Sequence, residues 1–368
     1  MCKINILIVS HEPLTPSLKQ LYCLEELKQS FNVRWISLRS FFHKKIMYFD
    51  DELKDEFIDF DNLSKFKNYL IKYPANSTYI FIENFASSLW TLYVNYIIRN
   101  YTICRYILYR SFWCDIKTYY KRTSFADLLN KKKLVQLIIR KFDRIPDIVF
   151  SAGAVESETK STKHISINST VKVDNPDVIE TENICVFIDQ GWPTHPDLIL
   201  HQNTEKIDDN KIKEFIDSYN KFFEYIENKL DIKVVIAKHP KSSIPDHYFN
   251  NRLIVTNDTT NLIRKSKFVI CHESLIINVA IQCYKPILNI YNNSFNKSDI
   301  HYQRIKFLSE ILGNKTINID GFDESEIDLT VNKNNYDEYI SKYITINNDK
   351  HNYQIITEAI INDFEEKN

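Results

Sequence analysis

The sequence Ile232-Lys-Val-Val-Ile-Ala-Lys238-His239-Pro240-Lys241-Ser242-Ser243 joins a short β-branched run to a basic turn. A run such as 232–237 is typical of a strand buried on both faces of a parallel sheet. Open α/β sheets bind ligands just beyond the carboxyl ends of their strands. The turn therefore brings positive charge and hydrogen-bond donors to a position that suits a phosphate. A plain solvated turn would contain the same residues, so the neighbouring loops have to decide between the two interpretations.

Strand-like runs alternate with helical patterns on both sides of this stretch. The predicted strands cover 4–10, 33–38, 77–83, 104–109, 147–150, 183–189, 232–237, 252–256, 267–271 and 285–291. The predicted helices cover 17–31, 61–72, 87–99, 128–142, 211–230, 261–266, 275–282, 299–312 and 353–364. This alternation predicts an α/β fold with two Rossmann-like doubly wound domains that face a central cleft.

The domain boundaries follow from a polar segment, 160–181, which we interpret as the crossing between domains. We expect an N-terminal domain over 1–165 and a C-terminal domain over 182–345. Residues 346–368 are expected to form a helix that packs back on the N-terminal domain. The length of 368 residues and the 44% hydrophobic content are sufficient for two cores.

Composition excludes several classes of protein. The net charge of −1 provides no basic field for nucleic acid. A GxGxxG loop and a P-loop are both excluded, because none of the four glycines has the required spacing. Seven cysteines without a CxxC pair indicate a reduced, cytoplasmic protein. No signal peptide is visible, and no apolar run reaches the roughly 18 residues of a spanning helix. The basic helix at 128–144 suggests peripheral contact with the inner face of a membrane.

Three polar loops follow strands of the second half, at 189–197, 238–243 and 272–274. In a doubly wound sheet these loops lie side by side, and helix amino ends there favour anions. We therefore predict a nucleotide-phosphate site at this edge. The residues predicted to form this site are Lys238, His239, Pro240, Ser242, His272, Glu273, Ser274 and Gln190.

The Lys-His-Pro turn, the later His272-Glu273-Ser274 helix start, Ala280 and Lys285-Pro286 resemble GT-B glycosyltransferases of bacterial surface polysaccharide synthesis. The turn is most similar to the His-Pro motif of the sialyltransferase, polysialyltransferase and Kdo-transferase group. The resemblance covers about 184–291 and is otherwise architectural. It implies that the domain over 1–165 binds the acceptor and the domain over 182–345 binds the nucleotide-sugar donor. His239 and Pro240 would then bind the donor and Ser274 would contact its phosphate, and the other residues of the predicted phosphate site would be donor-binding as well. The N-terminal half shows no clear Asp-rich base motif of the sialyltransferase kind.

The resemblance implies transfer of a CMP-activated nonulosonic acid, such as sialic acid or Kdo, to a glycan or glycolipid acceptor. The product would belong to capsule, lipopolysaccharide or O-antigen. An inverting, metal-independent reaction is expected, with the nucleotide sugar as co-substrate and no other cofactor. The one DxD triplet, Asp59-Phe60-Asp61, is interpreted as a solvated helix start rather than a metal site.

An inverting transferase needs a base that takes the proton of the acceptor hydroxyl. The loop after the first strand nominates Glu12 and then His11, although a plain turn explains both residues equally well. Asp115 is a weaker option. The residues assigned to the acceptor are His195, Asp197, Glu83 and Asn84.

Other functions stay open. One is a UDP- or dTDP-sugar transferase or a sugar-nucleotide epimerase, for which Glu273 would bind the ribose. Another is a non-catalytic scaffold of a polysaccharide assembly complex, which would use the basic and aromatic segment 89–142 to bind a membrane or a partner.

Overall fold

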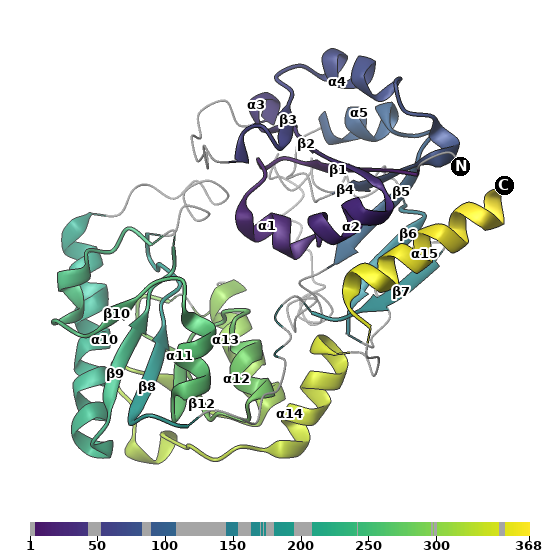
Figure 1. The fold of residues 1–368 in the computed structure, drawn as a ribbon. Helices are drawn as coiled ribbons and strands as arrows, with labels where there is room; N and C mark the ends of the chain where they lie inside the picture. Colours follow the sequence, from purple (N-terminus) through teal and green to yellow (C-terminus); the bar gives the residue numbers. More distant parts are fainter. Residues whose placement is uncertain are drawn as a thin grey trace, which may run out of the picture. The chain divides into compact units, whose positions relative to one another are not determined.

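The structure is a computed structural model that describes residues 4–42, 53–82, 90–107, 145–153, 163–169, 171, 173, 180–194, 208–240, 242–295, 297, 300–345 and 350–368. These residues fall into two compact units. Unit 1 takes its described residues from Met1–Arg110, Tyr120–Thr170 and Thr345–Asn368, and unit 2 takes them from Val171–Ile344. Both units consist of strands that alternate with helices (Figure 1).

Unit 1 contains a seven-stranded parallel sheet with the order β3-β2-β1-β4-β5-β6-β7. Its strands are β1 (Asn5–Ser10), β2 (Asn32–Ser37), β3 (Phe57–Asp59), β4 (Thr78–Ile82), β5 (Thr102–Ile107), β6 (Ile148–Ala152) and β7 (Lys163–Ile167). Its helices are α1 (Pro16–Leu21), α2 (Leu24–Ser30), α3 (Arg39–Phe42), α4 (Leu63–Leu70), α5 (Trp90–Ile97) and α15 (Asn352–Lys367), with a 3-10 turn at Ala75–Ser77.

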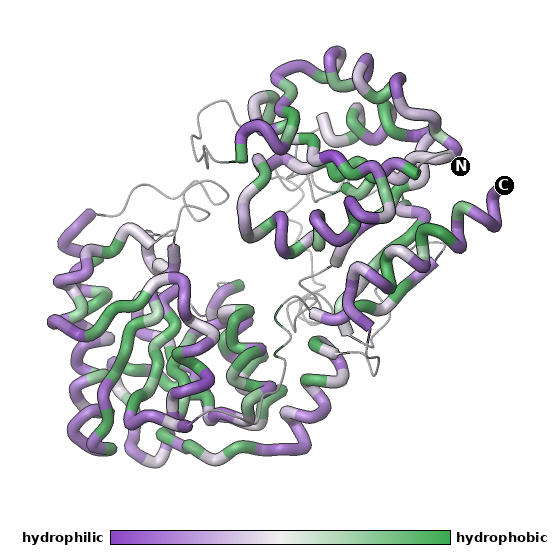
Figure 2. Tube along the Cα trace, viewed as in Figure 1, coloured by the Kyte–Doolittle hydropathy of each residue, from purple (hydrophilic) through white to green (hydrophobic). Residues whose placement is uncertain are grey.

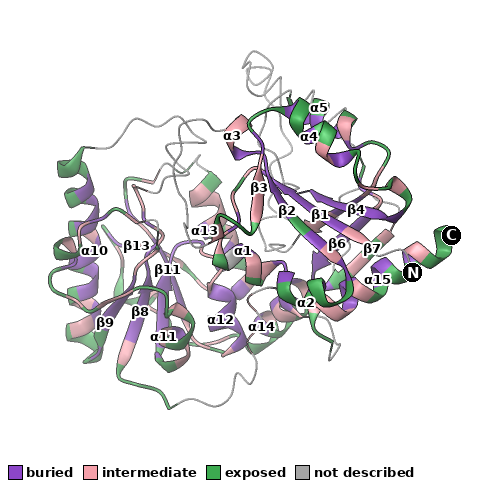
Figure 3. Ribbon diagram, turned by 45° about the horizontal axis from the view of Figure 1, so that its top comes forward, coloured by how far each residue is buried: buried purple, intermediate pink, exposed green. Residues whose placement is uncertain are grey.

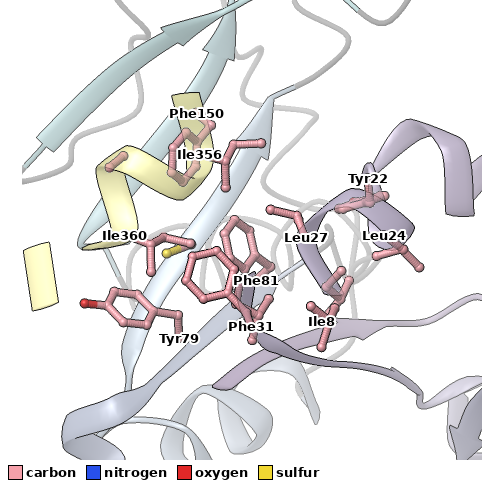
Figure 4. Close-up of a cluster of buried hydrophobic side chains, with 14 of the residues drawn as sticks. Ile8, Tyr22, Leu24, Leu27, Phe31, Tyr79, Phe81, Phe150, Ile356 and Ile360 are labelled. Atoms are coloured by element: carbon pink, nitrogen blue, oxygen red, sulfur yellow. The ribbon is translucent and has the colours of Figure 1, made fainter. Parts of the chain in front are cut away.

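Alternate side chains of β1 enter two different cores, as the pleat of a strand requires. Ile6 and Ile8 pack with helices α1, α2 and α15, whereas Leu7 and Val9 pack with α4 and α5. Figure 4 shows the first cluster, where Ile356 and Ile360 of α15 lie among side chains of the sheet. The Tyr79 hydroxyl also donates to Asp363 Oδ2 at 2.8 Å. The C-terminal helix is therefore part of the core of unit 1.

Unit 2 contains a six-stranded parallel sheet with the order β10-β9-β8-β11-β12-β13. Its strands are β8 (Ile184–Ile188), β9 (Lys233–Ala237), β10 (Ile254–Val255), β11 (Phe268–Cys271), β12 (Ile287–Tyr291) and β13 (Thr316–Asn318). Its helices are α10 (Asp209–Leu230), α11 (Thr259–Lys265), α12 (Ile277–Gln282), α13 (Ile300–Leu312) and α14 (Lys333–Tyr339), with a π-helix at Ile340–Ile344 and 3-10 turns at Asp246–Phe249 and Glu324–Glu326.

The central strands of both sheets are apolar along their length and buried on both faces (Figures 2 and 3). Burial on two faces explains why the sequence shows continuous apolar runs instead of an alternating pattern. The predicted pair of Rossmann-like parallel-sheet folds is confirmed. The order β3-β2-β1-β4-β5-β6 in unit 1 has the same pattern as the order β10-β9-β8-β11-β12-β13 in unit 2.

Several predictions of local structure are wrong. The division between the two units falls inside segment 160–181, but the segment also contains an unpredicted strand, β7, which is an edge strand with one largely exposed face. The helix predicted over 17–31 breaks at Cys23, whose φ of 49° cannot continue a helix. Asp59 is the last residue of β3 and not part of a helix start. Strand β13 and helix α14 were not predicted, and the helix predicted over 128–142 lies outside the described residues.

Candidate functional site

The unit 2 sheet has a topological switch point between β8 and β11. The chain moves from β8 outward to β9 and β10, and then returns to β11 on the other side of β8. Open α/β sheets bind ligands at such a point, just beyond the carboxyl ends of the two strands. The loops that leave this point begin at Asp189 and at His272. Residues that the sequence assigned to the donor therefore lie where this architecture binds ligands.

The two loops at the switch point contact each other directly. The Gln190 side-chain oxygen accepts the backbone N–H of Glu273 at 3.0 Å. One bond thus fixes the positions of two residues predicted to bind the donor. Gln190 and Glu273 are 83 positions apart in the sequence. They lie close together because the strands that precede them, β8 and β11, are neighbours in the sheet.

The Asp189 carboxyl group lies beneath this contact and is 4% exposed. Its Oδ1 accepts the N–H of Gly191 at 2.8 Å, and Gly191 has a φ of +70° that favours glycine. Burial raises the pKa of Asp189, although the hydroxyl of Ser242 and the N–H groups of Gly191 and His239 act against it. The carboxyl group therefore fixes the β8 loop through Oδ1, and groups of the turn after β9 lie close enough to it to influence its pKa.

His272 is a buried, neutral histidine. Its Nε2 and the Tyr219 hydroxyl share a hydrogen bond of 2.9 Å, and the rings of Phe187 and Phe295 lie against the imidazole. Burial, together with the nearby His301, lowers the pKa of His272 to about 3. A proton on this ring at neutral pH would leave an uncompensated charge in an apolar setting.

Several buried polar atoms at this edge have no hydrogen-bond partner among the described residues. They are Asp189 Oδ2, Ser242 Oγ, His272 Nδ1 and Asn289 Oδ1, and further atoms of this kind, such as Thr91 Oγ1 and Tyr106 OH, lie in unit 1. Such atoms are rare in folded proteins and usually indicate a water, an ion or a ligand. Four strands, β8, β9, β11 and β12, supply the atoms at this edge or end next to them.

The Glu273 carboxylate is 3% exposed and is held by helix α13. Oε1 accepts from His301 Nδ1, and Oε2 lies 3.8 Å from Arg304 Nε. The Trp192 ring packs edge-on against His301, with centroids 4.4 Å apart. The sequence analysis missed His301 and Arg304. Their spacing of three residues places them on one face of a helix, and that signal could have identified them.

The basic turn after β9 is internally bonded. Lys238 Nζ donates to the Ile244 carbonyl at 2.8 Å and to Asp246 Oδ1 at 2.5 Å. His239 is half-buried, Pro240 is exposed, and the His239 carbonyl accepts the N–H of Ser242 at 2.9 Å. The Lys238 ammonium group is thus engaged by its own loop, and its contact with a phosphate stays a prediction.

Ser274 lies in the turn that precedes α12. It is half-buried, and its carbonyl accepts the N–H of Ile277, where α12 begins, at 3.2 Å. The helix starts two residues later than predicted and has six residues. The Ser274 hydroxyl is consequently part of a turn and not of a long helix end, and its role as a phosphate contact stays a prediction.

Unit 1 has its own switch point, between β1 and β4. His11 and Glu12 follow β1, with His11 Nε2 and Glu12 Oε1 3.8 Å apart. Glu12 donates its N–H to Ser10 Oγ at 2.9 Å and accepts from Trp35 Nε1 at 3.1 Å. The backbone is therefore fixed while the Glu12 side chain is 48% exposed. This arrangement suits a base that has to meet a substrate.

All four residues predicted to bind the acceptor, Glu83, Asn84, His195 and Asp197, lie outside the described residues, as do Asp115 and the basic segment 128–144. Asp59 accepts the hydroxyl hydrogen of Ser40, and Asp61 pairs with Lys65 at 2.9 Å. The described residues contain no cluster of three His, Cys, Asp or Glu side chains that could hold a metal ion.

A hollow of about 270 Å³ lies elsewhere in unit 2, between α13, α14 and the π-helix. It is lined by charged and aromatic side chains, including Glu310, Glu338 and Lys342. None of the residues assigned to the donor lines it. This hollow is therefore separate from the switch point.

Comparison with known proteins supports the fold. The two parallel-sheet α/β units have the architecture of GT-B glycosyltransferases. Among solved structures, UGT2 of Phytolacca americana, complexed with UDP-2-fluoro-glucose and pterostilbene, has a TM-score of 0.52 and 8% identity. The similarity covers 98% of this chain and 94% of that chain.

Two further solved structures extend over a similar share of the chain. MurG of Acinetobacter baumannii has a TM-score of 0.45 at 9% identity, covering 98% of this chain and 95% of that chain. The UDP-GlcNAc 2-epimerase of Methanocaldococcus jannaschii, in complex with UDP-GlcNAc and UDP, has a TM-score of 0.47 at 10% identity. This similarity covers 98% of this chain and 99% of that chain. No protein-family model and no curated protein matches the sequence. No described helix is long and apolar enough to cross a membrane.

Proposed function

We propose that the protein is a glycosyltransferase that uses a nucleotide-sugar donor, with the donor nucleotide bound at the switch point of unit 2. The observation that carries this proposal is the group of four buried polar atoms without partners beside the switch point, Asp189 Oδ2, Ser242 Oγ, His272 Nδ1 and Asn289 Oδ1. A ligand with a ribose and a phosphate would supply the missing partners. The fold shared with a UDP-sugar-bound transferase supports this class of ligand.

In the proposed reaction, the acceptor hydroxyl oxygen attacks the anomeric carbon of the donor sugar. Its proton passes to Glu12, and the bond from the anomeric carbon to the donor phosphate breaks. Donors at the unit 2 edge, the hydroxyls of Ser242 and Ser274 and the charge of Lys238, stabilise the negative charge that develops on the phosphate. We propose an inverting outcome without a metal ion.

The donor proposed in finer detail is a CMP-activated nonulosonic acid, and the Lys238-His239-Pro240 turn is the support for it. A UDP-sugar is the alternative, supported by the ligand of the Phytolacca transferase. The acceptor would be a glycan or glycolipid of a bacterial surface polysaccharide. We propose that the reaction takes place in the cytoplasm, at the inner face of the membrane.

Thermal-shift titration with CMP, UDP, dTDP and GDP tests the proposal. Ligand binding stabilises by mass action, by about 2.7 kcal/mol at a hundredfold excess over Kd. We expect CMP alone to raise Tm, and His239→Ala to abolish the shift. His247→Ala is the matched control, because His247 is an exposed histidine of the same loop region.

A shift with UDP instead of CMP would replace the proposed donor and keep the site. A Tm shift that persists in His239→Ala would show that the nucleotide does not bind at the turn that contains His239. If none of the four nucleotides changes Tm, the transferase proposal fails and a scaffold function becomes the better account.

A further inference from the structure

A ladder of exposed aromatic side chains runs along α5 in unit 1. Trp90 is 55% exposed, Tyr93 39% and Tyr96 52%. Ring centroids of Trp90 and Tyr93 lie 6.3 Å apart, and those of Tyr93 and Tyr96 lie 6.1 Å apart. Arg99 stacks on the Tyr96 ring at 3.9 Å, and Phe41 contacts Trp90 at 5.5 Å. Single exposed apolar residues are ordinary, but a contiguous row of them is not.

A further exposed apolar side chain lies at the end of the neighbouring helix α4. Helices α4 and α5 lie side by side (Figures 1 and 3), and the Tyr101 hydroxyl donates to the Leu70 carbonyl at 2.7 Å. Ile71, the residue after Leu70, is 72% exposed. The α4–α5 face is defined here as Ile71, Trp90, Tyr93 and Tyr96 together with the cations that border them. Its opposite side anchors the helices, since Leu63, Phe66, Leu70, Val94 and Ile98 are buried in the core.

The charged residues of this face are all cations. Lys67, Lys72 and Arg99 are exposed, and segments 63–73 and 90–101 contain no Asp or Glu. Two carboxylates precede α4 in the sequence. Asp61 pairs with Lys65 at 2.9 Å, and Asp59 accepts a hydrogen bond from Ser40. Lys72 also lies over the Tyr69 ring, 5.5 Å from its centroid. The face thus combines exposed Trp and Tyr rings and an exposed Ile with a border of positive charge.

We propose that the α4–α5 face binds an anionic membrane surface. Trp and Tyr prefer the interface between water and lipid, where the ring is in an apolar setting and its polar atom stays hydrated. Basic residues beside them attract anionic headgroups. The exposed Ile71 favours lipid over a sugar polymer, because an aliphatic side chain has no flat face to stack on a sugar ring. Binding by this face requires neither the donor site of unit 2 nor transferase activity.

Vesicle co-sedimentation of the full chain tests this proposal. We expect binding to vesicles of phosphatidylglycerol and phosphatidylcholine, weaker by about fivefold when the salt concentration is raised to shorten the Debye length. The triple variant Ile71→Ser, Tyr93→Ser, Tyr96→Ser should bind at least about tenfold more weakly, because its apolar contact area is lost. Leu253→Ser with Tyr284→Ser, which changes exposed apolar residues of unit 2, should bind as the wild type does.

Trp90 provides a second readout. Its fluorescence should shift to shorter wavelength when vesicles are added, and Trp90→Phe should remove this shift while binding persists. Circular dichroism and the nucleotide-dependent Tm shift should be unchanged in all variants, because the replaced side chains are exposed.

Three results would overturn the proposal. The first is vesicle binding that the triple variant leaves intact, or no binding at all. The second is retention on a gel that contains dextran, lost in the triple variant while vesicles are not bound, which would identify a glycan surface. The third is a wild-type dimer that the triple variant converts to monomer, which would identify contact between two copies.

Discussion

The carboxyl edges of the two sheets share a strand order but differ in construction. At the unit 2 edge, Asp189, His272 and Glu273 are buried, and side chains from α10 and α13 hold His272 and Glu273 in place. At the unit 1 edge, the Glu12 backbone is fixed while its carboxylate reaches solvent. A buried, bonded edge suits a ligand of constant shape, such as a nucleotide. An exposed carboxylate on a fixed backbone, as at Glu12, suits a substrate that differs from one reaction to the next or that binds after the nucleotide.

The difference also predicts where substitutions act. Changes at the unit 2 edge should reduce stability and nucleotide binding together, because the same groups serve both. Changes at Glu12 should reduce turnover without reducing stability, because an exposed carboxylate contributes little to folding. Each experiment below tests this contrast.

The largest effect is expected for Glu12→Gln. Without a carboxylate to take the acceptor proton, turnover should fall by about 100-fold to 10,000-fold, the range for a general base. The nucleotide-dependent Tm shift should remain. The measurement is transfer or hydrolysis of the nucleotide sugar that the thermal-shift titration identifies. Glu26→Gln, an exposed carboxylate on α2, is the control.

A normal rate in Glu12→Gln would remove Glu12 from the mechanism. His11→Gln then becomes the deciding variant, since His11 lies 3.8 Å from Glu12 in the same loop. Loss of both turnover and stability in Glu12→Gln would contradict the contrast between the two edges.

Glu273→Ala should cost about 3 kcal/mol in the free energy of unfolding, because it leaves His301 and Arg304 without their buried carboxylate. It should also abolish the nucleotide shift by releasing α13 from the switch point. Urea unfolding followed by circular dichroism measures the first effect. Glu310→Ala, an exposed carboxylate of the same helix, should change the free energy by less than about 0.5 kcal/mol. Equal effects of the two substitutions would show that Glu273 does not hold the edge.

The pH dependence of stability should report His272. Its pKa is lowered to about 3 in the folded state, so the unfolded chain takes up a proton near pH 6.5 that the folded chain refuses. Stability is therefore complete above pH 6.5 and is lost as the pH falls. By pH 5 the loss should reach about 2 kcal/mol. The raised pKa of Asp189 acts in the opposite direction, because the folded chain binds the proton of this carboxyl group more tightly than the unfolded chain does.

Urea titrations at a series of pH values measure this loss. His272→Gln should flatten the dependence between pH 6.5 and 5, whereas His247→Gln, at an exposed position, should leave it unchanged. A wild-type protein whose stability is flat over this interval would show that His272 is not buried as a neutral ring. Asp189 is the same in all three proteins, so its contribution does not affect the comparison.

The residues of the unit 2 edge were predictable from the sequence because each follows an apolar strand. The run 232–237 and the polar residues after it placed Lys238 and His239 at a carboxyl edge, and parallel sheets bring such edges together. Likewise, the predicted start of strand β11 at Lys267 led to His272, Glu273 and Ser274.

Partners that come from helices were not predictable in the same way. Tyr219 appeared in the sequence only as one apolar position of α10, yet its hydroxyl bonds the buried His272. His301 and Arg304 lie on a helix that approaches the switch point only after the sheet has formed. Edge strand β7 escaped prediction because one of its faces is polar, so its composition resembles a loop. Tertiary packing, and not local pattern, decides these positions.

The smallest effect concerns Lys238, whose ammonium group Asp246 engages at 2.5 Å. Asp246 is 67% exposed, so the pair contributes little to stability, within about 1 kcal/mol. Asp246→Ala should free the ammonium group and tighten nucleotide binding by about threefold, the scale of an exposed ion pair. Glu324→Ala, which breaks the exposed pair with Lys229, should leave nucleotide affinity unchanged. Weaker binding in Asp246→Ala would mean that the closed turn, with Lys238 held by its own loop, is the form that recognises the phosphate.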